Sequence, residues 1–265
     1  MFFHMKKITT LLLFCIISIT LFSQVLTKST TPQTIQNEII GYTSISSINL
    51  VSYSYQPPLI PTQGVPIDGD STSEGNGVYV FANSIQSTIN ISNGNITSTP
   101  QGKVWTLKIN IPNALNIGIH FSQFNLSPIA EMYIYNEAKT VLKYKIKKGD
   151  FTNSDSVLIS SIKGNSIIVY IIEPGNFGTF QSNILINKLI AGFQEIGEVG
   201  ESENTLAPST NCIPHIQCYP DKMSTARSVA RIIISRGVNT FGACTGTLIN
   251  NELNNGRAYF LTAFH

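Results

Sequence analysis

Charged side chains are scarce in this sequence: only 12% of its 265 residues are Asp, Glu, Lys or Arg. So low a charge fraction, with Ser, Thr, Asn and Ile spread throughout, argues against a charged disordered chain and against a coiled coil. No cluster of Lys or Arg is present either, so the chain has no basic patch of the kind that binds phosphate backbones. Nucleic acid is therefore excluded as a partner.

An apolar run long enough to span a bilayer is missing at the N-terminus. The run at residues 8–22 falls short of the roughly 20 residues that a spanning helix needs. Lys6 and Lys7 precede it and the small residue Ser23 follows it, which is the order of a secretory signal peptide. We expect residues 1–23 to be a signal peptide of a secreted protein without stable membrane insertion, the alternative being an uncleaved anchor.

Removal of residues 1–23 would change the charge and the cysteine count. Without Lys6 and Lys7, the 17 basic residues become 15, equal to the 15 acidic ones. Cys15 would be lost as well, leaving three cysteines, all in the last fifth of the chain: Cys212, Cys218 and Cys244. Exported cysteines usually pair, so an odd number indicates either a free thiol or a missing partner.

Long segments with helical periodicity are also absent, and short strand-like runs separated by turn residues take their place. Residues 24–76 are rich in Ser, Thr and Pro and are expected to form an irregular lead-in, with a strand allowed within 39–51. Residues 77–196 are expected to form an antiparallel β-sandwich. The predicted strands are 78–85, 87–92, 104–111, 117–121, 132–135, 141–147, 156–162, 166–172 and 184–193.

The clearest of these runs alternates between apolar and polar side chains, which predicts one buried and one solvent-facing side. The apolar set is Trp105, Leu107, Ile109 and Ile111, and the polar set is Thr106, Lys108 and Asn110. His120 is expected to face solvent, and the aromatic residues of the region are expected to be structural. The sequence Gly69-Asp70-Ser71 is interpreted as a turn and not as a nucleophile motif.

The last part of the chain has a different composition. Residues 197–211 are acidic, contain no Lys or Arg and are expected to form a linker. Residues 212–265 contain three strand-like runs, at 226–235, 242–249 and 258–265. The second run reads Cys-Thr-Gly-Thr-Leu-Ile from Cys244, and the third reads Tyr-Phe-Leu-Thr-Ala-Phe-His and ends at His265.

These runs resemble the start of the mature domain of bacterial lysyl endopeptidases and related trypsin-fold serine proteases. The resemblance covers about residues 207–265. It rests on the pair Cys212 and Cys218, on the Cys-Thr-Gly strand, and on the Tyr-Phe-Leu-Thr-Ala strand that leads to a His. It implies an all-β fold, in which the sandwich is a pro-region and residues 212–265 are the first three strands of a double β-barrel.

The resemblance also implies a role for each matching residue. His265 would be the general acid and base of a Ser-His-Asp triad that hydrolyses protein or peptide substrates. Cys212, Cys218 and Cys244 would form disulfides with partners beyond the chain end. The Asp, the Ser and the oxyanion hole would also follow His265, so the sequence is expected to be an inactive N-terminal fragment of a precursor. No cofactor or metal is expected.

Two departures from the family pattern and one alternative chemistry matter for function. Phe264 stands where close relatives often have a second His. No Lys or Arg occurs between Lys188 and Lys222, so a different protease is expected to carry out maturation. Cys212, His215 and Cys218, together with Cys244, could instead bind zinc, although their spacing is atypical of zinc modules. The alternative function is a secreted β-sandwich binding or adhesion module with a vestigial protease remnant.

Overall fold

The computed structural model describes most of the chain from the lead-in onward. The described residues are 26–39, 42, 48–59, 79–151, 156–175, 178–195, 219–236, 239–250, 253, 255, 257 and 259–262. The predicted signal peptide and linker and the Gly69-Asp70-Ser71 turn lie outside these residues. The division of the chain into domains therefore stays a prediction.

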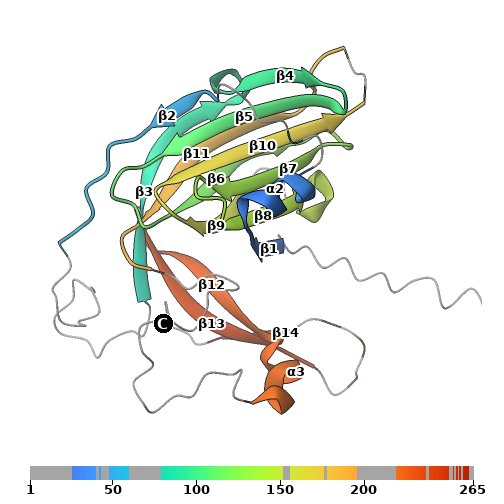
Figure 1. Ribbon diagram of the computed structural model, residues 1–265. Coiled ribbons are helices and arrows are strands. Elements are labelled where there is room, and N and C mark those ends of the chain that lie inside the picture. The colour runs from blue at the N-terminus through green and yellow to red at the C-terminus, as the bar shows by residue number, and fades with distance from the viewer. Residues whose placement is uncertain are drawn as a thin grey trace, which may run out of the picture.

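The described part is an all-β fold built from two sheets, and the all-β class is the one that the sequence predicted (Figure 1). The described strands form no closed barrel, and the strands within 229–262 that were expected to begin one extend the second sheet. The first, sheet A, has the order β1-β8-β7-β10-β5-β2, with β4 also paired to β5. Its strands are β1 (Leu26–Ser29), β2 (Leu50–Ser52), β4 (Asn95–Thr99), β5 (Gly102–Asn110), β7 (Glu131–Asn136), β8 (Val141–Ile146) and β10 (Ser166–Pro174). All its pairs are antiparallel except that of β2 with β5.

The second, sheet B, has the order β12-β13-β3-β11-β6-β9, with β14 also paired to β13. Its strands are β3 (Tyr79–Asn90), β6 (Asn116–Asn125), β9 (Val157–Lys163), β11 (Asn183–Gly192), β12 (Val229–Arg236), β13 (Thr240–Ile249) and β14 (Tyr259–Thr262). The short helices of the described chain are α2 (Pro32–Glu38), η1 (Ile91–Asn93), η2 (Lys148–Asp150), η4 (Pro220–Lys222) and α3 (Met223–Ala226).

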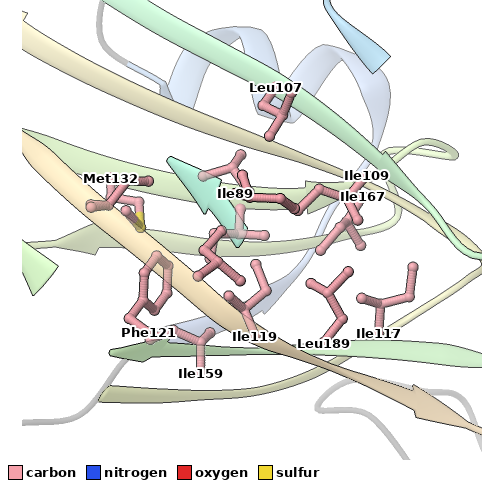
Figure 2. Packing of buried hydrophobic residues seen from close by; sticks show 14 of the residues in the cluster. Ile89, Leu107, Ile109, Ile117, Ile119, Phe121, Met132, Ile159, Ile167 and Leu189 are labelled. Atoms are coloured by element: carbon pink, nitrogen blue, oxygen red, sulfur yellow. The ribbon is translucent and has the colours of Figure 1, made fainter. Parts of the chain in front are cut away.

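The main core lies between the two sheets, where apolar side chains from both interleave (Figure 2). Leu107 and Ile109 of β5 contribute from sheet A, and Ile119 of β6 and Leu189 of β11 contribute from sheet B. The predicted buried side of 105–111 is confirmed, since its apolar side chains are all fully buried. Burying a Leu or Ile stabilises a fold by roughly 1.5–3 kcal/mol, so a core of this kind can hold the sandwich together.

The outer side of sheet A differs from the expectation. Thr106 was predicted to face solvent but is fully buried, because a second apolar cluster covers this side of the sheet. Ile35 of α2 and Ile39 pack there against Tyr133 and Tyr170. The lead-in is therefore not irregular throughout: β1, α2 and β2 lie within it, and α2 lies over sheet A (Figure 1).

Two further details of strand prediction were wrong. The runs 78–85 and 87–92 form one continuous strand, β3, because Ser87 sits inside the sheet and donates a hydrogen bond to the Ile186 carbonyl at 2.7 Å. β4 was not predicted, since its sequence, Asn-Ile-Thr-Ser-Thr, has a single large apolar residue. It forms because it pairs with β5 along five residues.

Candidate functional site

The strand that carries the Cys-Thr-Gly sequence is β13, and it pairs with the Tyr-Phe-Leu-Thr strand, β14. The two strands are antiparallel, with Gly246 opposite Thr262 and Ile249 opposite Tyr259. The Thr262 hydroxyl donates a hydrogen bond to the Thr245 carbonyl at 3.0 Å and ties the end of β14 to β13. The two sequence motifs are therefore neighbours in space.

Gly246, the glycine of the Cys-Thr-Gly sequence, lies beneath an aromatic ring. A Cβ atom built on Gly246 would lie 2.3 Å from Cε1 of Phe260 and 2.9 Å from the Leu261 carbonyl oxygen. Contacts this short are sterically forbidden. The glycine is therefore needed because the Phe260 ring of β14 lies directly across the β13 backbone.

A set of hydroxyl groups ties the start of β12 to β13. Ser228 donates to the Thr225 carbonyl at 2.7 Å, and its hydroxyl lies 3.0 Å from that of Thr247. The Leu248 amide donates to the Ser228 carbonyl at 2.8 Å. The turn at α3 is thus held against the same part of β13 that holds β14.

The cysteine of this strand, Cys244, is half-buried on β13 opposite Ile232 of β12. Its Sγ atom lies 3.6 Å from the Thr245 carbonyl oxygen. The other two predicted disulfide cysteines, Cys212 and Cys218, lie outside the described residues. Their pairing therefore stays a prediction.

The predicted catalytic residue, His265, also lies outside the described residues and follows Thr262 by three positions. The structure describes the strand that leads to it and the two contacts that hold this strand, one from Thr262 and one from Phe260. A general base must keep a fixed position relative to its nucleophile. Sequence reasoning had identified the motif and missed these two holding contacts.

No group of three or more His, Cys, Asp or Glu side chains with metal-binding geometry occurs among the residues that the structure describes. The alternative zinc set cannot be judged from this finding, because Cys212, His215 and Cys218 are outside that part of the chain. A zinc site there stays a hypothesis.

Among the residues that the structure describes, no helix is long and apolar enough to cross a membrane.

His120 lies on the opposite side of sheet B from the main core and is half-buried. One ring nitrogen, Nδ1, lies 2.7 Å from Oδ1 of Asn187, and the other, Nε2, lies 3.1 Å from the hydroxyl of Ser156. These contacts hold the ring between β6, β11 and the start of β9. His120 is therefore a partner in a side-chain network and less exposed than expected.

The fold is all-β, and its last described strands, β13 and β14, carry the two sequence motifs and pair with each other. Residues 206–265 match the family described as "Lysyl endopeptidase, C-terminal domain". The resemblance inferred from the cysteines, the Cys-Thr-Gly strand and the final His is thereby confirmed, and with nearly the same boundary. The chain is lysyl endopeptidase-like over this segment.

Proposed function

We propose that the chain is the N-terminal part of a secreted serine endopeptidase precursor. In this proposal residues 1–23 direct export, residues 77–196 form a β-sandwich pro-region, and residues 212–265 begin the protease domain. The observation that carries the proposal is the pairing of β13 with β14 in a segment that matches the lysyl endopeptidase family. The substrates would be proteins or peptides.

His265 would act as general acid and base in this enzyme. It would take the proton of a serine hydroxyl during attack on the peptide carbonyl and return it to the leaving amine. Strand β14 supports this role, because its pairing with β13 and the Thr262 hydrogen bond hold the backbone shortly before His265. The serine and aspartate partners follow the His in chain order in this fold, so residues 1–265 alone would not hydrolyse peptides.

The proposal is tested by measuring peptide hydrolysis by the protein that a longer reading frame encodes. We expect the product of a reading frame continued past the codon for His265 to cleave a peptide substrate. The variant His265→Ala should lower kcat by about 10⁴-fold or more, because triad members act as a unit. The matched control is His120→Ala, which removes a histidine in the sandwich and should leave kcat unchanged.

Two results would count against the proposal. An extended product that is folded but shows no hydrolysis, or one whose activity survives His265→Ala, would remove the protease assignment. A stop codon directly after His265 would favour the alternative, a secreted binding or adhesion module whose working part is the sandwich.

A further inference from the structure

Strand β13 pairs with one strand along one edge and with two strands along the other. Along one edge it pairs with β12 over eight residues, from Thr240 opposite Arg236 to Thr247 opposite Val229. The other edge is divided between two strands. The sandwich strand β3 occupies it at Thr240–Ala243, and β14 occupies it further on, at 246–249.

The part of β3 that pairs with β13 extends beyond the sandwich sheet. β11 pairs with β3 only from Ala82 to Asn90, whereas β13 pairs with it from Tyr79 to Asn83. Tyr79 and Val80 are therefore paired with β13 and not with β11. Figure 1 shows this end of β3 projecting from the sandwich toward β12 and β13.

Side chains fix the contact as well as backbone pairing. Phe241 of β13 is 6% exposed and packs in a cluster with Phe81, Ala82 and Ile190 of the sandwich. Ile233 of β12 lies against the same cluster. Phe241 thus anchors the part of the chain from β12 to β14, within residues 229–262 and here called the protease segment, in the apolar cluster of the sandwich.

Hydrogen bonds at the start of β13 set the register of this contact. The Ser84 amide donates to the Asn239 carbonyl at 2.7 Å, and the Ser84 hydroxyl lies 3.3 Å from Oδ1 of Asn239. A bulge between Phe241 and Gly242 shifts the pairing by one residue on β3. Bulges end or redirect pairing at sheet edges, so the site is shaped for a short partner strand.

We infer that the projecting end of β3 is a built-in template for the protease segment. It presents a ready sheet edge on which β13 is added as a strand, and Phe241 holds the added strand in place. The same contact covers an edge of β13 that would otherwise be open to pairing with other chains. This inference rests on the proposed function for the identity of the two parts.

Association after cleavage tests the template. A recognition site for a sequence-specific protease is inserted after Glu203 in the full chain, the chain is cut, and the dissociation constant of the two pieces is measured. We expect the pieces to remain together on size-exclusion chromatography. Phe241→Ala should weaken their association by about 100-fold or more, because it empties a buried aromatic site.

The matched control is Leu261→Ala, which truncates an apolar side chain of the same strand group that is 58% exposed. It should leave the association nearly unchanged. The inference is overturned if the unmodified pieces separate on cutting. It is also overturned if Phe241→Ala and Leu261→Ala have equal effects.

A disulfide cross-link between β3 and β13 tests the inference even if Phe241→Ala prevents the protease segment from folding. Asn83 and Thr240 are directly opposite each other. Changing both to Cys, in a chain whose native cysteines are replaced by Ser, should give a disulfide that keeps the cut pieces together until it is reduced. Thr88→Cys with Thr240→Cys is the mismatched control. Equal cross-linking of both pairs would overturn the inference.

Association and cross-linking of the cut pieces test the inference separately from the proposed function, because neither measurement needs hydrolysis. Pieces that stay associated in an extended chain without protease activity would remove the proposed function and leave the contact. An active protease whose pieces separate freely would do the reverse.

Discussion

Glu173 is the most deeply buried carboxylate whose contacts the structure describes. It is 1% exposed and accepts hydrogen bonds from the amides of Gln181 and Ser182 and from the Ser182 hydroxyl. Ser182 in turn accepts a hydrogen bond from the Ser127 amide. One carboxylate therefore holds the connection between β10 and β11 closed and links it to the residues before β7.

Replacing this carboxylate by an amide should be costly. Glu173→Gln would turn an NH₂ group toward amide donors, and we expect the free energy of unfolding in urea to fall by about 2–3 kcal/mol. The control Glu137→Gln removes an exposed ion pair with Lys108 and should cost at most about 1 kcal/mol. Equal losses for the two variants would show that burial of Glu173 contributes nothing.

Glu131 should make folding sensitive to acid. Burial acts to raise its pKa, but hydrogen bonds from the Tyr133 hydroxyl and from Nζ of Lys147, with the charges of Lys147 and Lys145, lower it below 4.5. A lowered pKa in the folded state stabilises the protein above the ordinary value of the group. This stabilisation is lost as the pH falls through the folded pKa.

Urea unfolding between about pH 3 and pH 6 measures this effect. The free energy of unfolding of the unmodified chain should fall below about pH 4.5 more steeply than that of Glu131→Gln. Parallel pH profiles for the two proteins would contradict the assignment of the acid effect to Glu131.

At the scale of elements, the contact between β13 and β14 depends on residue 246 being a glycine. Gly246→Ala would push a methyl group into the Phe260 ring and the Leu261 carbonyl. We expect the β13–β14 pairing to weaken by about 1–3 kcal/mol, since overpacking forces the backbone to move. Faster amide hydrogen exchange in β14 would report it.

Two variants control this prediction. Gly149→Ala adds a methyl group where no atom lies within 4 Å and should leave the exchange of β14 unchanged. The double variant Gly246→Ala with Phe260→Ala should restore part of the protection, because it removes the ring that clashes. A double variant as disturbed as the single one would place the cause elsewhere.

Strand prediction from the sequence worked where a single segment carries the signal. The alternation from Trp105 to Ile111 placed the core side of β5 correctly. Thr106 was misassigned because its burial depends on α2, about 70 residues earlier in the chain, and no local pattern reports such coverage. The same reason explains β4, which is a strand because β5 offers it an edge.

At the candidate site, too, the local motifs could be predicted from the sequence and the contacts between distant residues could not. The Cys-Thr-Gly and Tyr-Phe-Leu-Thr sequences were recognisable as motifs, and their resemblance to lysyl endopeptidases is confirmed. The reason for the glycine was not readable, because it lies in the ring of Phe260, 14 positions later. The contact of Phe241 with the sandwich was equally hidden, since it joins β3 to a strand about 160 residues away.

At the scale of the whole molecule, apolar exposure is uneven. The outer strands β12 and β14 and the end of β13 expose several large apolar side chains, whereas the described sandwich buries most of its own. The exposed set is Val229, Leu248, Ile249, Tyr259, Phe260 and Leu261. The register places Leu248 and Phe260 on one side of the β13–β14 pair and Ile249 and Tyr259 on the other. Exposed apolar side chains grouped at one end of a sheet mark contact sites or association hazards.

Self-association of the 265-residue chain should therefore start at this end. Leu261→Lys should lower the apparent mass measured by light scattering at high protein concentration, because a charge opposes apolar contact. Leu50→Lys changes a residue of β2 that is 56% exposed in the sandwich, and it should leave the mass unchanged. An equal effect of both changes would mean that overall charge, and not this surface, controls association.

The strand order of sheet B also determines when each part can form as the chain is made. β3 is synthesised early, but its partner β11 ends at Gly192. Most of the edge of β3 that pairs with β11 therefore stays unpaired until about 90 further residues have been synthesised. Pairing over such separations is slow, because loop closure precedes any gain from contact. Once β11 is in place, β12 and β13 follow within about 60 residues, and β13 pairs with the other edge of β3. The slow step of folding thus belongs to the sandwich, and β12 and β13 are added to a sheet that already exists.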